Sequence, residues 1–148
     1  MKAYTAEFLG TATLLFFGCS AITIGGLGAA LGSGQPLSPL ALLPIACAFG
    51  LTVAALACSI GPISGCHINP AVSLGVWAAG RLPTSELPGY LVAQFLGAIA
   101  GAALLSFVLA GKAGGYDVGA LGLGQNGWGG YSAMSAFIVE LGQPYYLS

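Results

Sequence analysis

Four runs of apolar residues, separated by short segments rich in glycine, proline and polar residues, make up most of the first 110 positions of the chain. The runs cover residues 8–24, 40–60, 69–80 and 87–110. The first, second and fourth contain 17, 21 and 24 residues, and an α-helix needs about 20 to cross a bilayer. With some extension of the first run, we expect transmembrane helices at residues 5–27, 40–60 and 87–110.

The run at residues 69–80 is too short to cross. A helix of its 12 residues would be about 18 Å long, against roughly 30 Å for the hydrocarbon core. Asn69 is a good N-cap and Pro70 a good first helical residue, whereas Gly61 and Pro62 are expected to end the preceding helix. The pattern therefore predicts a non-helical loop at residues 61–68 and a half-helix at 69–80.

A half-helix that begins at Asn69 would place its electropositive end near the middle of the bilayer. Non-helical backbone at that depth is tolerated only where protein covers it or where it lines a water-filled cavity. We therefore interpret residues 61–80 as a re-entrant segment beside an aqueous passage, with loop carbonyls as acceptors and the Asn69 amide as a donor. Such a passage suits small neutral solutes, above all water. The alternative is an ordinary loop-to-helix junction with no role beyond capping.

The composition is that of a membrane protein. Hydrophobic residues make up 57% of the chain and charged residues 5%, whereas soluble domains carry about 25% charged residues. Residues 8–80 contain no Asp, Glu, Lys or Arg. The basic residues Lys2, Arg81 and Lys112 are scattered, so we expect no nucleic-acid partner. Lys2 and Arg81 fall on one side of the predicted spans, which favours a cytoplasmic N-terminus.

The residues that most often bind metals or act as nucleophiles give little support for either role here. Cys19, Cys47, Cys58 and Cys66 lie in apolar stretches without metal-binding spacing, so we expect buried, unreactive thiols. His67 is the single histidine and is expected to be a packing residue. Cys66 beside His67 lacks a carboxylate to orient the pair. We therefore expect no enzyme activity, no metal and no cofactor.

Small residues recur on the last predicted span. Ala93, Gly97 and Gly101 are spaced by four residues, which places them on one helix face. Such a face lets a neighbouring helix approach closely. The neighbour could belong to the same chain or to a second copy.

The segment Ser-Gly-Cys-His-Ile-Asn-Pro-Ala-Val at residues 64–72 resembles the first signature loop of the major intrinsic protein family, the aquaporins and glycerol facilitators. Residues 6–11, 48–52 and 89–94 resemble the family's first three helices, and residues 130–132 with Glu140 resemble the start of its fourth. The resemblance covers about residues 3–141 and is nearest to the bacterial water-selective branch.

The resemblance implies an all-α membrane protein with an aquaporin-like helical bundle. Residues 1–131 would form the first inverted repeat, with three transmembrane helices, the re-entrant loop and half-helix at 61–80 and a loop at 111–131. Residues 132–148 would begin a second repeat that is truncated early in its fourth helix. Residues 6–8 and 139–141 look like the same point of the two repeats.

The resemblance also implies a set of pore residues, namely Gly65, Cys66 and His67 in the loop, Asn69, Pro70 and Ala71 in the signature motif, and Phe49 at the outer constriction. Asn69 would orient water and the loop carbonyls would line the water file. Family members that pass glycerol usually carry tryptophan at the place of Phe49, so phenylalanine there favours water.

Glu7 is an ionisable residue in apolar surroundings, which favours a functional role. A position at the interface near the N-terminus would explain it equally well. The resemblance implies the functional role, because Glu7 and its fourth-helix counterpart Glu140 would brace the pore loops through hydrogen bonds to backbone.

These expectations describe a passive water channel in a cell membrane, specifically a bacterial inner membrane, with water as permeant, the lipid bilayer as surroundings and a homo-oligomer, by resemblance a tetramer, as assembly. We expect the truncated form to conduct poorly on its own. The alternatives are a glycerol or small-solute facilitator, a non-conducting fragment that associates with other subunits, and an unrelated small membrane protein. Self-association through the small residues of the 87–110 span is one further expectation.

Overall fold

A computed structural model describes residues 1–25, 39–124, 132–135 and 138. The helices that it defines with bounds are α1 (Lys2–Thr23), α3 (Pro39–Ser64), α4 (Pro70–Ala78), α5 (Leu87–Ala110) and α6 (Val118–Leu121). All secondary-structure elements in this part of the chain are helical, which confirms the all-α class. Lys2–Thr23, Leu42–Ser64 and Leu87–Ala110 are long and apolar enough to cross a membrane. The chain is therefore a multi-pass membrane protein.

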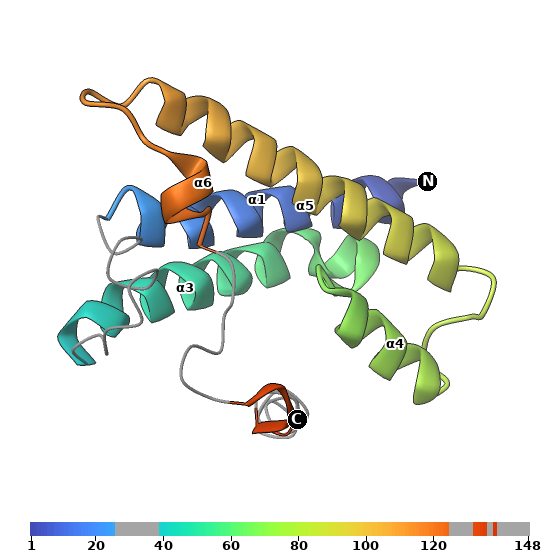
Figure 1. Ribbon diagram of the computed structural model, residues 1–148. Coiled ribbons are helices and arrows are strands. Elements are labelled where there is room, and N and C mark those ends of the chain that lie inside the picture. The colour runs from blue at the N-terminus through green and yellow to red at the C-terminus, as the bar shows by residue number, and fades with distance from the viewer. Residues whose placement is uncertain (26–38, 125–131, 136–137, 139–148) are drawn as a thin grey trace.

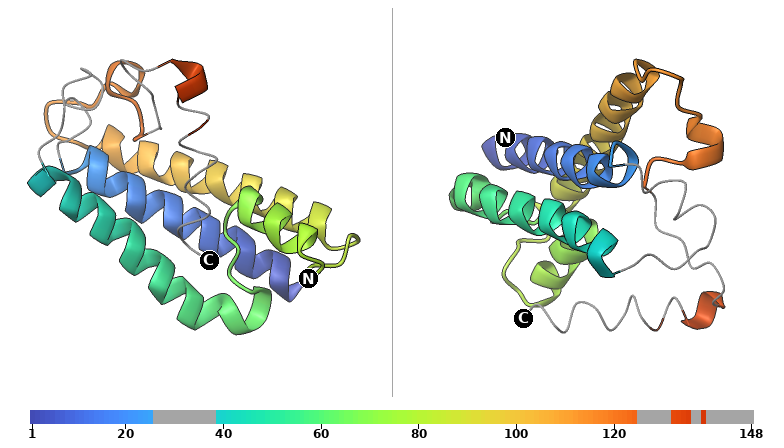
Figure 2. Two further views of the ribbon diagram at one scale, coloured as in Figure 1. Left: turned by 90° about the horizontal axis from the view of Figure 1, so that it is seen from below. Right: turned by 90° about the vertical axis from the view of Figure 1, so that its left-hand side faces the viewer.

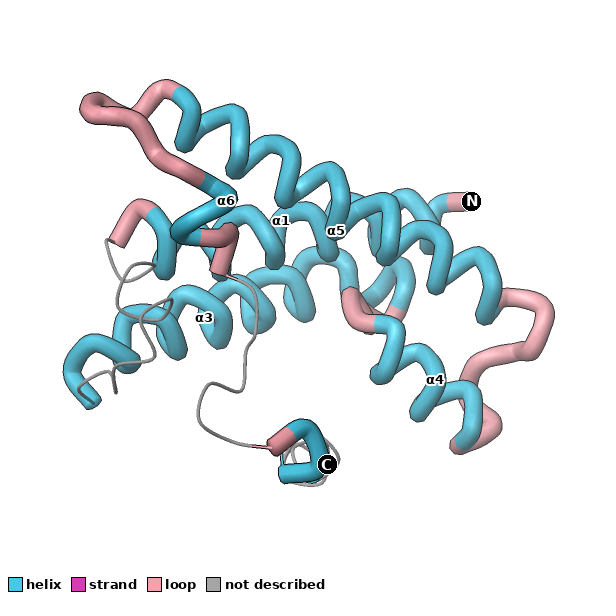
Figure 3. The backbone as a smooth tube through the Cα atoms, viewed as in Figure 1, coloured by secondary structure: helices cyan, strands magenta, loops and turns pink. Residues whose placement is uncertain are grey.

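The helix α1 lies between α3 and α5 and contacts both along its length (Figure 1). The two further views show the same arrangement, with α4 beside the half of α5 that follows its N-terminus (Figure 2). A short non-helical segment joins the end of α3 to α4 (Figure 3). The loop that carries the signature motif is thus held among three helices that are far apart in sequence.

Glycine residues allow α1 and α5 to pack closely. A Cβ atom at Gly97 would collide with the carbonyl oxygen of Phe8, and one at Gly101 would come within 2.5 Å of the carbonyl oxygen of Ala12. The predicted small-residue face is therefore a helix contact within the chain. The backbone of α1 already occupies the face at Gly97 and Gly101, so these two glycines are not available for self-association.

The structure corrects the predicted end of the second span. The helix α3 does not stop at Gly61 and Pro62 but continues to Ser64, and the amide of Gly65 still donates to the carbonyl of Gly61 at 2.8 Å. Proline removes only one backbone donor, and membrane helices tolerate it where other groups satisfy the freed carbonyl. The non-helical segment before α4 therefore covers residues 65–69 rather than 61–68.

Two other predicted boundaries also differ. The helix α1 covers Lys2–Thr23, three residues earlier at its start than the predicted span. The predicted loop at 111–131 contains the short helix α6, which Asp117 caps by accepting hydrogen bonds from the amides of Gly119 and Ala120. An aspartate cap of this kind is a local signal that the glycine-rich composition obscured.

The cysteines differ in burial. Cys19 is buried in a small core with Leu105 and Leu109, as expected. The expectation is wrong for Cys47 and Cys58, which are exposed on α3, and Cys66 is half-buried. The reason is that α3 contacts α1 on one side only, so much of its apolar surface is not covered by the described part of the chain.

Candidate pore loop

The Glu7 carboxylate is the centre of the candidate site. It is completely buried on α1 and accepts four hydrogen bonds. Oε1 accepts from the Ser64 hydroxyl at 2.6 Å and from the His67 amide at 2.9 Å. Oε2 accepts from the Ile68 amide at 2.6 Å and from Gln94 Nε2 at 2.8 Å. Four donors satisfy the lone pairs of a buried carboxylate without a cation, since hydrogen bonds to a charged acceptor are the strong ones.

The loop that Glu7 holds has an unusual backbone. Gly65 has a φ of 85°, and the non-glycine residues Cys66 and Ile68 have φ of 53° and 44°. Left-handed conformations are uncommon for such side chains, cost of order 1–3 kcal/mol each and persist only when the surroundings enforce them. The hydrogen bonds to Glu7 provide that enforcement. This backbone geometry was not foreseen from the sequence.

The hydrogen bonds also fix where the loop carbonyls point. The Cys66 amide donates to Ser64 Oγ at 3.2 Å, and the next two amides donate to Glu7. In a trans peptide the carbonyl points opposite to the amide N–H. The carbonyls of Cys66 and His67 therefore point away from Glu7, and the carbonyl of Gly65 points away from Ser64 Oγ. None of them has a hydrogen-bond donor among residues 1–25 and 39–124, so they remain available as acceptors.

Asn69 caps α4, as predicted. Its Oδ1 accepts a hydrogen bond from the Ala71 amide at 2.8 Å, and Pro70 follows as the first helical residue. The side-chain oxygen is thus engaged in the cap, and the amide nitrogen is left to donate elsewhere. Asn69 is exposed. An available donor therefore lies two residues after the last of the three available carbonyls.

A second set of polar contacts lies behind the loop. Gln94 Nε2 bridges Glu7 and Ser73, donating to Ser73 Oγ at 2.8 Å. His67 Nδ1 lies 3.0 Å from the same hydroxyl, and its ring lies 5.0 Å from that of Tyr90. His67 is buried, which agrees with its expected packing role. No group of three metal-binding side chains occurs among the described residues.

Tyr90 closes the end of α3. Its hydroxyl donates to the carbonyl of Ser64 at 2.7 Å, which is one of the terminal helix carbonyls that lack a partner within the helix. The ring packs edge-on against Tyr4 at 5.9 Å, and the Tyr4 hydroxyl donates to Glu86 at 2.5 Å. The end of α3 is thereby tied to both α1 and α5.

Four residues of this cluster were not predicted as site residues from the sequence, namely Ser64, Ser73, Tyr90 and Gln94. Each is buried. Ser73 and Gln94 are polar residues inside apolar runs, so the same reasoning that singled out Glu7 could have found them. Their mutual proximity could not be found, because it depends on how α4 and α5 pack.

Not every predicted site residue lies at this loop. Phe49 is half-buried on α3, fifteen residues before Ser64, which is about 22 Å along the helix, and its ring contacts Gly18 of α1. Glu140 lies outside the described residues. The structure therefore brings together Glu7, Gly65, Cys66, His67 and Asn69, with Pro70 and Ala71 following in α4. Phe49 lies apart from them, further along α3.

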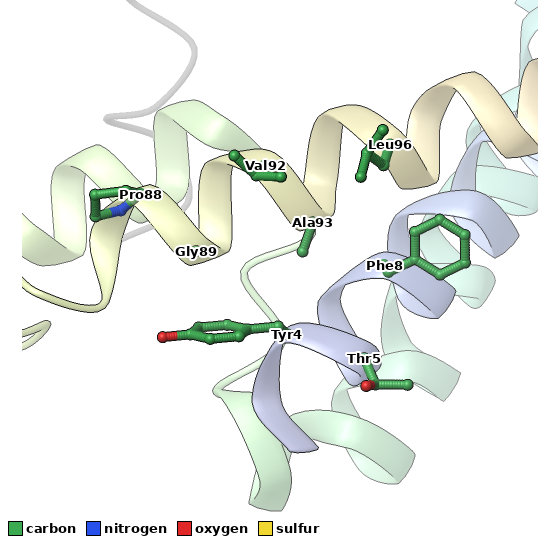
Figure 4. Close-up of a pocket in the computed structure, with 8 residues that line it drawn as sticks. All are labelled: Tyr4, Thr5, Phe8, Pro88, Gly89, Val92, Ala93 and Leu96. Atoms are coloured by element: carbon green, nitrogen blue, oxygen red, sulfur yellow. The ribbon is translucent and has the colours of Figure 1, made fainter. Parts of the chain in front are cut away.

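An apolar groove of about 540 Å³ lies elsewhere, between α1 and α5 (Figure 4). Its walls include Tyr4, Phe8, Gly89, Val92 and Leu96, and the Tyr4 ring occupies the space above Gly89. None of its lining residues belongs to the loop or donates to Glu7. The groove is thus separate from the candidate site.

Comparison with known proteins places these features in context. A sequence profile described as the major intrinsic protein family matches residues 1–146. The chain is 42% identical over 143 residues to Aquaporin Z of Rhodopseudomonas palustris, covering 93% of this chain and 56% of that protein. It is 46% identical over 146 residues to Aquaporin Z of Brucella melitensis, covering 95% and 60%. The chain therefore spans somewhat more than half the length of these two relatives.

Proposed function

Because this chain belongs to the major intrinsic protein family, we propose that residues 65–69 and α4 form one half of the wall of a passive water channel. One observation carries the proposal. Glu7 and Ser64 accept hydrogen bonds from three successive amides, so that three successive carbonyls point away from these two side chains and precede the exposed Asn69. An acceptor row that ends in a donor matches the hydrogen-bonding needs of single-file water.

In this proposal each loop carbonyl accepts a hydrogen bond from a passing water molecule. The Asn69 amide nitrogen donates to the water oxygen, because its oxygen is already bound to Ala71. The N-terminal end of α4 adds a positive dipole end beside Asn69. That dipole orients the water oxygen toward the helix and raises the cost of placing a cation there.

Glu7 acts as a brace in this proposal and does not touch the permeant. Its four hydrogen bonds support that role. We propose the corresponding role for Glu140 from the family resemblance alone. Phe49 is the proposed bulky member of an outer constriction, and phenylalanine there favours water over glycerol.

We further propose a channel with no catalytic activity, no bound cofactor and no nucleic-acid partner. Lys2 and Arg81 would lie on the cytoplasmic side, which places the N-terminus there. Both compared relatives are bacterial proteins, which supports a bacterial inner membrane. A homotetramer is proposed from the family resemblance.

The described helices leave one side of the proposed pore uncovered. Asn69 and Ala71 are exposed, as are Val72 and Leu74 on α4. Polar groups at membrane depth need protein or water around them. We infer that conduction requires a further wall-forming segment and that the described helices conduct poorly without one. A non-conducting subunit that associates with others is the second candidate function that this exposure favours.

Water transport can be tested directly. Because we expect poor conduction by this chain alone, proteoliposomes that contain the full 148 residues should shrink only slightly faster than empty liposomes in a stopped-flow sucrose gradient, and Asn69→Ala should remove that small excess rate. In a glycerol gradient we expect little re-swelling beyond that of empty liposomes. Rapid re-swelling would favour the facilitator alternative, and shrinkage equal to that of empty liposomes would contradict a channel formed by this chain.

The thiol of Cys66 offers a second test of the loop's position. Cys66 is half-buried between two residues whose carbonyls are available, so a bulky thiol reagent bound there should block water flux. Cys47 and Cys58 are exposed on α3 and would also react. The measurement therefore compares a Cys47→Ser, Cys58→Ser background with and without Cys66→Ser. Unchanged flux after verified labelling of Cys66 would place the thiol outside the passage.

A further inference from the structure

The ring of Phe49 rests directly on the backbone of α1 at Gly18. A Cβ atom at Gly18 would come within 2.5 Å of Phe49 Cζ and 2.8 Å of Cδ1, and closer still to Cε1. Gly18 is buried. Any residue larger than glycine would therefore overlap the aromatic ring.

Gly18 differs in this respect from the glycines of α5. The atoms nearest to a Cβ at Gly97 and at Gly101 include the backbone of α1, so those glycines allow two helices to approach. The three atoms nearest to a Cβ at Gly18 all belong to the Phe49 ring. Gly18 therefore accommodates a side chain rather than a neighbouring backbone.

The opposite side of Phe49 is less constrained. Phe49 itself is only half-buried, so part of its side chain is not covered by the described residues. A ring pushed from the α1 side can thus tilt outward, at a cost of order 0.5–1.5 kcal/mol for leaving its rotamer. Separating α1 from α3 would instead break their packing along its whole length. A side chain added at Gly18 is therefore expected to move the Phe49 ring and not the two helices.

We propose that Gly18 is a positioning residue for Phe49, holding its ring against α1 and thereby setting the bore of the passage at that level. The inference rests on the proposed function, in which Phe49 is the bulky side chain of the outer constriction. A methyl group at Gly18 displaces the ring from α1 toward the open side. The bore narrows, and water passes more slowly.

The experiment uses the full chain in proteoliposomes and measures both the environment of the Phe49 ring and the water permeability. A 4-fluorophenylalanine introduced at position 49 alone reports the ring by fluorine NMR. Gly18→Ala should shift that resonance and lower the water permeability severalfold. Phe49→Leu in the Gly18→Ala background should restore most of the flux, because the smaller side chain no longer overlaps the methyl group. Gly50→Ala adds a methyl group with no atom within 4 Å and should change neither the fluorine resonance nor the water permeability.

The outcomes separate the inference from the proposed function. An unchanged fluorine resonance in Gly18→Ala overturns the positioning role. A shifted resonance with equal loss of flux in the single and double variants overturns the link between ring and bore. If the unmodified chain carries no water while Gly18→Ala still shifts the resonance, the proposed function falls and the positioning of the ring is upheld.

Discussion

Replacing Glu7 with glutamine should release the loop at residues 65–69 and abolish water transport. The carboxylate accepts four hydrogen bonds, whereas a carboxamide offers one oxygen and turns an NH₂ group toward the remaining donors. Each buried donor left without a partner costs about 1–3 kcal/mol. The Ser64 hydroxyl or the Gln94 side chain can turn to accept from that NH₂ group, but the backbone amide of His67 or of Ile68 loses its acceptor. We therefore expect a loss of about 1–3 kcal/mol in unfolding free energy.

Hydrogen exchange of the His67 and Ile68 amides in detergent or nanodiscs is the most direct measure of whether Glu7 holds the loop. Both amides should exchange faster in Glu7→Gln, together with lower thermal stability and no water flux. Glu86→Gln is the matched control, because Glu86 is a half-buried carboxylate that accepts a single hydrogen bond near the end of the bundle. Retained protection of both amides in Glu7→Gln would show that the carboxylate does not hold the loop.

Replacing Gly97 with alanine should separate α1 from α5 and destabilise the whole bundle. The added methyl group meets the carbonyl of Phe8, and a backbone carbonyl cannot rotate away as a flexible side chain can. Overpacking of this kind costs about 1–3 kcal/mol. The site is affected as well, because α5 carries Tyr90 and Gln94, which bind Ser64, Glu7 and Ser73.

The Gly50→Ala substitution serves as control for Gly97→Ala and should raise the melting temperature, whereas Gly97→Ala should lower it. Nothing lies within 4 Å of a Cβ at Gly50, and alanine is favoured over glycine in a helix interior by up to about 1 kcal/mol. Thermal unfolding in detergent, followed by far-ultraviolet circular dichroism, compares the two. Equal melting temperatures for the two variants would mean that the α1–α5 contact tolerates a methyl group and that its packing is looser than described.

Local signals in the sequence predicted the elements that depend on nearby residues. Run length marked the three long helices, and Asn69 followed by Pro70 marked the start of α4. The same local reasoning failed at Pro62, because the helix continues past a proline whose missing donor costs little at that place. The helix ends instead at Gly65, whose φ of 85° is the left-handed conformation common just after a helix C-terminus. Tyr90 binds the carbonyl of Ser64 there from 26 positions away.

The site could be predicted only in part for a related reason. The family resemblance pointed to Glu7 as a brace, and the contacts to Ser64, His67 and Ile68 support that role. Gln94 was visible as a polar residue in an apolar run, yet its bridge between Glu7 and Ser73 requires α4 and α5 to pack side by side. Sequence spacing contains no direct information on that packing.

The position of Glu7 on the first helix constrains how the chain enters the membrane. Its partners follow 57, 60, 61 and 87 residues later, so all of them are synthesised after Glu7. An acidic side chain in a lone helix costs of order 2.5–3.5 kcal/mol at the membrane centre. The carboxyl group of Glu7 therefore lacks these donors until the later segments have inserted, and Gln94 of α5 is the last of the four donors along the chain.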